Sequence, residues 1–330
     1  MLLIGYLSGC AAARPSTRPV SADRYLRQPG LFRSFDPNAR ELSVVNAYLL
    51  ELAARAGDCE STSQAKLVRG WGFNRHRQIF DRLHSAYAYV ASDDRMVLVA
   101  FCGSDPMNLR DMQSDAAALW PKHDGRYCQR DDAVVHPGFS ESLDSIWDGL
   151  CEEVRTQARR RNDPNAPTTT RPSYKPVWIT GHSRGGAFAL LAASGFSQLA
   201  DFPPVAGVYT FGQPKVGNAA FAQAFDASGI PYFRFVTAHD AVAGQPIKLP
   251  KMTSEYVHAG TMAYFDESGK LHRNPPESTL SLCRLDPDHY QAQYQLAIYA
   301  LLRQPERIED ETWRAGAAGV EKVKVPKPYM

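Results

Sequence analysis

Apolar residues recur along the chain with two different periods, which predict alternating strands and helices. Helical spacing of apolar residues predicts a helix over 40–56. Two β-prone runs, 85–90 and 96–101, flank a short polar turn and predict a hairpin. The second run is continuously apolar, which is typical of a strand buried on both faces.

The same alternation continues to the end of the apolar pattern. The further predicted elements are a helix at 140–160, a strand at 176–180, a small-residue helix through 200, a strand at 205–211, a helix at 219–226, a strand at 232–236 and a helix at 290–302. Strands and helices that alternate at this spacing predict an α/β fold with a parallel sheet and helices on both faces.

Breaks in the pattern predict the domain organisation. Residues 11–37 are rich in Pro, Arg and Ser without a sustained period, and we interpret 1–37 as a signal-like segment followed by a linker. A Pro-rich break at 161–172 is too short to separate two domains. We therefore expect one α/β domain over 38–310 and a basic tail over 311–330, with no internal repeat.

Composition narrows the class of protein. The 330 residues are 44% hydrophobic and 22% charged, as in ordinary globular proteins, and a net charge of +2 does not favour a nucleic-acid partner. No apolar run approaches the roughly 20 residues that span a bilayer. The six cysteines show no CxxC spacing, which argues against a zinc site. We expect neither a metal nor another cofactor.

The first ten residues are apolar and end in Leu7-Ser-Gly-Cys10, which resembles a bacterial lipobox. The resemblance implies a lipid on Cys10, membrane association through it, and a place in the bacterial cell envelope or outside the cell. No Lys or Arg precedes Cys10, although signal peptides begin with a basic stretch. A cytoplasmic protein is the alternative. In an exported chain the other five cysteines can form two disulfides.

Gly181-His-Ser183-Arg-Gly185 fits the G-x-S-x-G pattern of a nucleophilic serine. In this arrangement the serine occupies a sharp turn between a strand and a helix, and its neighbours must be small to let the backbone close. The predicted strand at 176–180 and the small-residue helix that follows supply this context. The alternative is a glycine-rich turn with a surface serine.

Three segments together resemble the fungal-type, or class 3, lipases. They are the elbow at 181–186, Tyr209-Thr-Phe-Gly-Gln-Pro-Lys-Val-Gly-Asn218 and Val135-His-Pro-Gly-Phe139, and the matching blocks run from about residue 97 to 290. The resemblance implies an α/β-hydrolase fold, with a mostly parallel central sheet and helices on both faces. It also implies ester hydrolysis by a catalytic triad.

A serine nucleophile needs a base and an acid, and in α/β-hydrolases the order along the chain is Ser, Asp or Glu, then His. Asp240 follows the predicted strand at 232–236 and resembles the acid of the family. Asp286 and Asp288 are rivals that we expect to shape the loop around His289. We therefore predict Asp240 as the acid.

His289, in Leu285-Asp-Pro-Asp-His-Tyr290, precedes the last predicted helix and resembles the catalytic histidine of the family. His258 is the alternative base, although it matches a segment that is not catalytic in the family. His182 and His239 adjoin members of the predicted triad, and we interpret both as structural histidines. We predict Ser183, Asp240 and His289 as the triad.

The tetrahedral intermediate of ester hydrolysis needs hydrogen-bond donors for its oxyanion. The backbone N–H of Arg184 is one candidate, because it follows the nucleophile. Ser104 resembles the second donor of the family, although Cys102 stands where the family commonly has Arg. Residues 109–120 show amphipathic helical spacing and predict a lid, with a permanently packed helix as the alternative.

We therefore hypothesise that the chain is a serine carboxylic-ester hydrolase acting on acylglycerols or phospholipids through an acyl-serine intermediate. The alternatives are a small-ester or feruloyl-type esterase, and an inactive lipoprotein scaffold. The complete set of Ser183, Asp240 and His289 argues against a scaffold, because no structural role requires all three.

Overall fold

The computed structural model describes residues 27–56, 61–84, 86–103, 121–160, 173–238, 240–246, 255–276 and 291–317. Several sequence predictions lie outside these ranges. They are Cys10, Ser104, the lid at 109–120, His239, Asp286, Asp288 and His289.

The strands form one eight-stranded sheet whose spatial order equals the order along the chain. The strands are β1 (Arg75–Asp81), β2 (Ala86–Ser92), β3 (Val97–Phe101), β4 (Val177–His182), β5 (Val205–Phe211), β6 (Tyr232–Thr237), β7 (Thr261–Phe265) and β8 (Leu271–Arg273). Strands β3 to β7 are parallel to one another, and β1, β2 and β8 are added antiparallel at the two sides. The predicted α/β fold with a mostly parallel sheet is confirmed.

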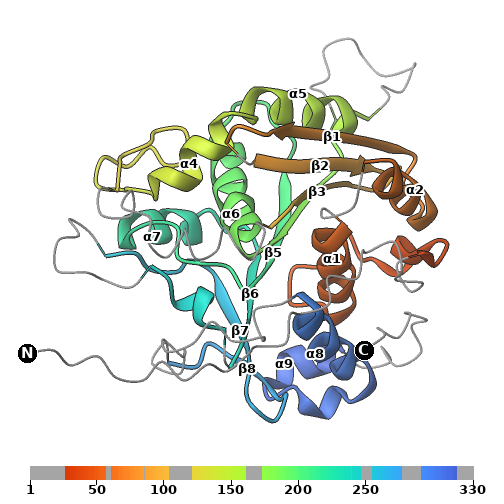
Figure 1. The fold of residues 1–330 in the computed structure, drawn as a ribbon. Helices are drawn as coiled ribbons and strands as arrows, with labels where there is room; N and C mark the ends of the chain where they lie inside the picture. Colours follow the sequence, from red (N-terminus) through yellow and green to blue (C-terminus); the bar gives the residue numbers. More distant parts are fainter. Residues whose placement is uncertain are drawn as a thin grey trace, which may run out of the picture.

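The helices of the successive crossovers lie on one face of the sheet (Figure 1). They are α4 (Pro137–Asp144), α5 (Trp147–Ala158), α6 (Arg184–Ser197) and α7 (Ala219–Ala227). Each crossover steps to the next strand in the same direction. Since such connections are right-handed, their helices collect on the same side.

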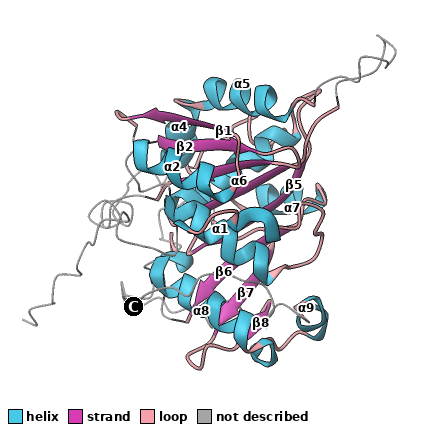
Figure 2. Ribbon diagram, turned by 90° about the vertical axis from the view of Figure 1, so that its right-hand side faces the viewer, coloured by secondary structure: helices cyan, strands magenta, loops and turns pink. Residues whose placement is uncertain are grey.

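The other face is covered by helices from the two ends of the described chain, as Figures 1 and 2 show. They are α1 (Val44–Ala56), α2 (Ser61–Trp71), α8 (Gln291–Arg303) and α9 (Glu311–Gly316). Strand β3 divides its side chains between the two cores: Val99 faces the crossover helices and Leu98 faces α1. The predicted strand buried on both faces is therefore confirmed.

Some elements differ from the sequence pattern. The helix predicted over 140–160 is two helices, and the break places Ile146 and Trp147 in the core, where Trp147 packs edge-on against Tyr127. Strand β1 was not predicted, because it is an edge strand whose residues are mostly polar. Helix α2 and strands β7 and β8 were not predicted either.

The core extends past the predicted limits at 38 and 310. A 3-10 helix at Leu31–Ser34 buries Phe32, and α9 buries Trp313 against the same core. Large aromatic side chains on both flanks gain from burial, so these segments pack with the domain. Cys128 and Cys151 are buried thiols outside any disulfide. Within the described ranges, no helix has the length and apolar character to cross a bilayer.

Candidate active site

Ser183 occupies the sharp turn between β4 and α6 that the sequence pattern predicts. Its backbone has φ 55° and ψ −128°, in a region that residues with a side chain adopt rarely. The turn is held by a hydrogen bond in which the Ser183 N–H donates to the Phe211 carbonyl, at 2.9 Å. Strained residues of this kind persist where the surrounding structure imposes them, and they concentrate at functional sites.

The glycines on either side of Ser183 are required by close backbone contacts. A Cβ on Gly185 would lie 2.5 Å from the Phe101 carbonyl oxygen, and a Cβ on Gly181 would overlap the Gly185 carbonyl. The side chain of Ser183 is itself buried. The alternative of a surface serine in a glycine-rich turn therefore disagrees with the structure.

Arg184 is the first residue of α6, so its backbone N–H lies at the positive end of the helix dipole. Its guanidinium packs over the Phe188 ring at 5.0 Å, and burial lowers the pKa of Arg184. The end of β3 passes close by, since a Cβ on Gly103 would lie 3.9 Å from Ser183 Cβ. The strand that precedes Ser104 in sequence therefore reaches Ser183.

Asp240 is buried in the turn that follows β6, where it caps a 3-10 helix at Ala241–Gly244. One carboxylate oxygen accepts a hydrogen bond from the Val242 N–H at 2.9 Å. The other oxygen accepts a hydrogen bond from the Tyr294 hydroxyl at 2.5 Å. The β6 and β4 strands are parallel members of one sheet, so Asp240 and Ser183 follow strand ends at the same edge.

Tyr294 is a residue of this site that sequence reasoning missed. It projects from α8, and its hydroxyl also accepts a hydrogen bond from the Thr237 N–H at 3.3 Å. Burial, reinforced by the charge of Asp240, raises the pKa of Tyr294 well above its ordinary value, so the hydroxyl keeps its proton. Its ring lies 6.0 Å from that of His182. Its position shortly after His289 was the available signal.

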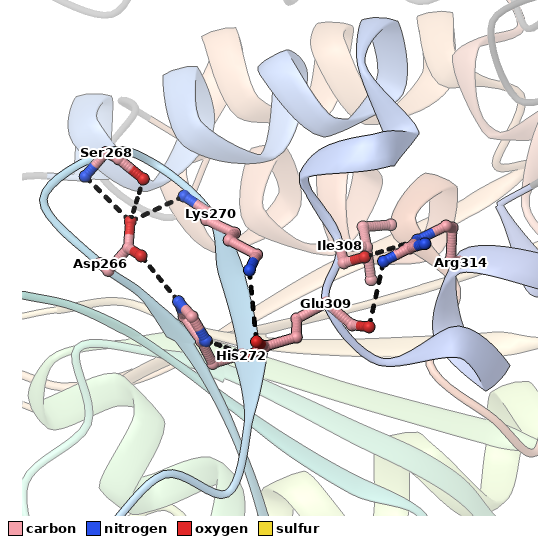
Figure 3. A network of polar contacts seen from close by, with 7 residues as sticks. All are labelled: Asp266, Ser268, Lys270, His272, Ile308, Glu309 and Arg314. Atoms are coloured by element: carbon pink, nitrogen blue, oxygen red, sulfur yellow. Dashed lines mark hydrogen bonds and ion pairs between the residues drawn. The ribbon is translucent and has the colours of Figure 1, made fainter.

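The other histidines have different surroundings. His258 donates from Nε2 to the Ala243 carbonyl at 2.6 Å, which ties it to the turn that carries Asp240, and burial lowers its pKa well below the ordinary value. His272 lies on β8 in a polar cluster with Asp266 and Glu309, which Figure 3 shows. Among the residues described, no group of His, Cys, Asp and Glu could hold a metal ion.

Comparisons with known proteins point to one family. The sequence profile of class 3 lipases matches residues 98–249. A lipase of Rhizomucor miehei is 29% identical over 235 residues, which cover 69% of this chain and 54% of the relative. A secreted mono- and diacylglycerol lipase A of Penicillium cyclopium is 28% identical over 244 residues, covering 70% of this chain and 72% of the relative. The chain thus spans about half the length of the Rhizomucor miehei relative.

A solved structure supports the same fold. A fungal lipase–inhibitor complex, described as a basis for interfacial activation in lipases, superposes with a TM-score of 0.53. The aligned residues are 24% identical and cover 70% of this chain and 83% of the other. At this level of identity the match shows a shared architecture.

Proposed function

We propose that this chain, which belongs to the class 3 lipase family, is a serine hydrolase that cleaves the carboxylic esters of acylglycerols. The observation that carries the proposal is the strained backbone of Ser183 between β4 and α6. The buried carboxylate of Asp240, held by Tyr294 at the same edge of the sheet, supports it. The Rhizomucor miehei relative is a lipase, and the Penicillium relative is a mono- and diacylglycerol lipase.

In this mechanism His289 is the base. It accepts the proton of Ser183 Oγ as the oxygen attacks the ester carbonyl, and it then donates that proton to the departing alkoxide. Water then attacks the acyl-serine while His289 accepts one of its protons, and His289 returns that proton to Ser183 Oγ as the carboxylic acid leaves. Asp240 orients the imidazole and stabilises its positive charge, as the acid of a triad does.

Two contacts favour His289 over His258 as the base. His289 stands two residues before α8, and α8 brings Tyr294 against Asp240. His258 instead donates its Nε2 proton to Ala243, so that ring nitrogen is occupied by a structural contact.

The oxyanion in this proposal is bound by the backbone N–H of Arg184 and by Ser104. The position of Arg184 at the start of α6 and the approach of Gly103 to Ser183 support these two donors. Each such donor contributes roughly 3–4 kcal/mol to lowering the barrier. Residues 109–120 form the lid that covers the acyl groove, with the amphipathic spacing of the sequence as its support.

We infer one catalytic domain over 38–310, to which the packed flanks at 31–35 and 311–317 are added. We also propose a signal-like segment and linker before this domain and a basic tail after it. The protein acts outside the cytoplasm, in the bacterial envelope with a lipid on Cys10 or as a secreted enzyme. The Leu7–Cys10 pattern supports the first place, and the secreted Penicillium relative supports the second.

A panel of esters with increasing acyl length, including a phospholipid, tests the proposed activity. We expect the wild type to hydrolyse emulsified long-chain acylglycerols, and Ser183→Ala to lose at least about four orders of magnitude in rate. Soluble short-chain esters as the sole substrates would indicate the small-ester alternative. A fluorophosphonate probe should label Ser183 stoichiometrically, and an unlabelled, correctly folded protein would contradict the proposal.

A further inference from the structure

The large apolar side chains that the described ranges expose most strongly all lie on one β-hairpin. Phe80 is 50% exposed, Leu83 is 85% exposed and Tyr87 is 37% exposed. Single exposed apolar residues are common on protein surfaces, but a group of them marks an interaction site. These three fall within eight residues, at the turn between β1 and β2. We refer to residues 80–84 and 86–87 as the hairpin tip.

The hairpin tip lies at the end of the sheet where the parallel strands have their carboxyl ends, which is the end that carries Ser183. Strand β2 runs antiparallel to β3, so its first residues adjoin the carboxyl end of β3. The Cys102 N–H donates to the Tyr87 carbonyl at 3.0 Å, and the next residue, Gly103, approaches Ser183. The exposed apolar side chains are therefore neighbours of the catalytic edge.

Local contacts hold the tip in a defined shape. The Phe80 and Tyr87 rings stack at 6.0 Å with an interplanar angle of 11°, and the Arg82 guanidinium lies 5.7 Å from the Phe80 ring. The Asp81 carboxylate accepts a hydrogen bond from the Leu83 N–H at 2.7 Å and pairs with His84 at 3.2 Å. Leu83 is thus presented to solvent by an ordered turn, which lowers the entropic cost of binding.

Positive charge accompanies this apolar group. Arg82 is exposed and belongs to the hairpin tip, where its guanidinium lies over the Phe80 ring. Asp81, the one carboxylate of the hairpin tip, pairs with His84. An exposed apolar group that carries an arginine is complementary to a lipid surface with negative charge.

We propose that the hairpin tip docks the enzyme on the surface of an anionic lipid aggregate. Phe80, Leu83 and Tyr87 enter the region between head groups and acyl chains, and Arg82 pairs with an anionic head group. Docking in this position brings the catalytic edge against the lipid from which the substrate comes. This role rests on the proposed function.

Vesicle binding of the full chain tests the proposal. All variants carry Ser183→Ala, to prevent hydrolysis, and Cys10→Ser, so that no lipid attached there contributes. Co-sedimentation is measured with phosphatidylcholine vesicles that contain phosphatidylglycerol. Leu83→Ser removes apolar surface without changing charge, and Arg82→Glu reverses one charge. The matched control is Arg159→Glu. Arg159 is exposed and lies at the opposite end of the parallel strands from Ser183. Its neighbour Ala158 accepts a hydrogen bond there from the Lys175 N–H, just before β4.

We expect Leu83→Ser to bind these vesicles roughly tenfold more weakly, the effect of withdrawing one leucine side chain from an apolar environment. Arg82→Glu should weaken binding as well, and by less in high salt. Arg159→Glu should bind like the reference. Equal binding of Leu83→Ser and the reference would overturn the proposal, as would a reference protein that does not sediment with the vesicles.

A parallel assay separates this proposal from the proposed function. With Ser183 restored, Leu83→Ser should hydrolyse a soluble short-chain ester at the wild-type rate and lose activity on vesicle-bound substrate. If the wild type hydrolyses neither substrate, the proposed function fails. If it hydrolyses both and Leu83→Ser does the same, only the docking role fails. Concentration-dependent dimerisation that Leu83→Ser abolishes would assign the hairpin tip to contact between copies, and would also overturn it.

Discussion

Two carboxylates follow neighbouring parallel strands at the same edge of the sheet, and the fold gives them different surroundings. Asp240 comes after β6 and is 1% exposed, whereas Asp266 comes directly after β7 and its side chain is 32% exposed. Both accept hydrogen bonds from nearby backbone and from the side chain of another residue. Asp240 receives the hydroxyl of Tyr294, and Asp266 receives the imidazole of His272 at 2.7 Å.

The two clusters teach that a carboxylate–histidine contact alone does not make a catalytic site. His272 contacts Asp266 with one ring nitrogen and Glu309 with the other, so both nitrogens are occupied (Figure 3). Lys270 also pairs with Glu309, at 3.2 Å, and the cluster joins the β7–β8 hairpin to the segment before α9. This cluster connects two segments at the surface. Asp240 is shielded from water and lies at the edge that carries Ser183, which suits it to stabilise a charge formed during a reaction.

Replacing each of the two aspartates by asparagine should give the largest difference in activity between the two regions. We expect Asp240→Asn to lower kcat on a soluble ester by about 10⁴-fold, because the amide neither fixes the required tautomer of the base nor stabilises its charge. Asp266→Asn is the matched control and should leave kcat unchanged. Initial rates of the two purified variants decide the matter, and similar losses in both would show that Asp240 has no special role.

Removing the hydroxyl that holds Asp240 should give a smaller effect. We expect Tyr294→Phe to lower kcat about tenfold with little change in KM, since the acid loses a positioning hydrogen bond and the substrate loses no contact. The free energy of unfolding should fall by about 1–3 kcal/mol, as for other hydrogen bonds to charged groups.

Tyr299→Phe on the same helix provides the control for that change. The Tyr299 ring lies 6.0 Å from that of Tyr48, and the substitution keeps the ring. Steady-state kinetics and urea unfolding of both variants are the measurements. A loss of stability in Tyr294→Phe without any change in kcat would make Tyr294 a purely structural residue.

The surface cluster should give the smallest effect, and one that depends on pH. Burial opposes ionisation of Asp266, but hydrogen bonds from Ser268 and His272 lower its pKa to about 2. Because the folded pKa lies below the unfolded value of about 3.9, Asp266 stabilises the protein above roughly pH 4. This stabilisation is lost as the pH falls toward about 2. Partial exposure limits it to about 1 kcal/mol.

Urea unfolding of the wild type and of Asp266→Asn at neutral and acidic pH measures this contribution. We expect the amide variant to be less stable near pH 7 and the difference to shrink as the pH approaches the pKa of Asp266. A difference that is the same at both pH values would assign the loss to altered packing in place of lost charge.

Much of the fold could be predicted because the relevant signals are local. The hairpin of β2 and β3, the strand before Ser183, the helix after it and strand β5 all follow from residue periods within a few positions. Strand β1 escaped prediction because an edge strand has one partner and little buried surface, so its residues carry no alternating pattern. The break between α4 and α5 was not predicted, because no glycine or proline marks it in the sequence. The packing of Trp147 in the core causes it.

The sequence by itself determined the elbow, since Gly181 and Gly185 must be small wherever a strand turns into a helix this sharply. It also placed the predicted nucleophile, Ser183, before the predicted acid, Asp240, along the chain. Only the tertiary structure decided the burial of Asp240, its contact with Tyr294 across 54 residues, and the approach of the hairpin tip to the catalytic edge. The physical reason is that these contacts join segments distant along the chain, and the packing of helices on the sheet brings them together.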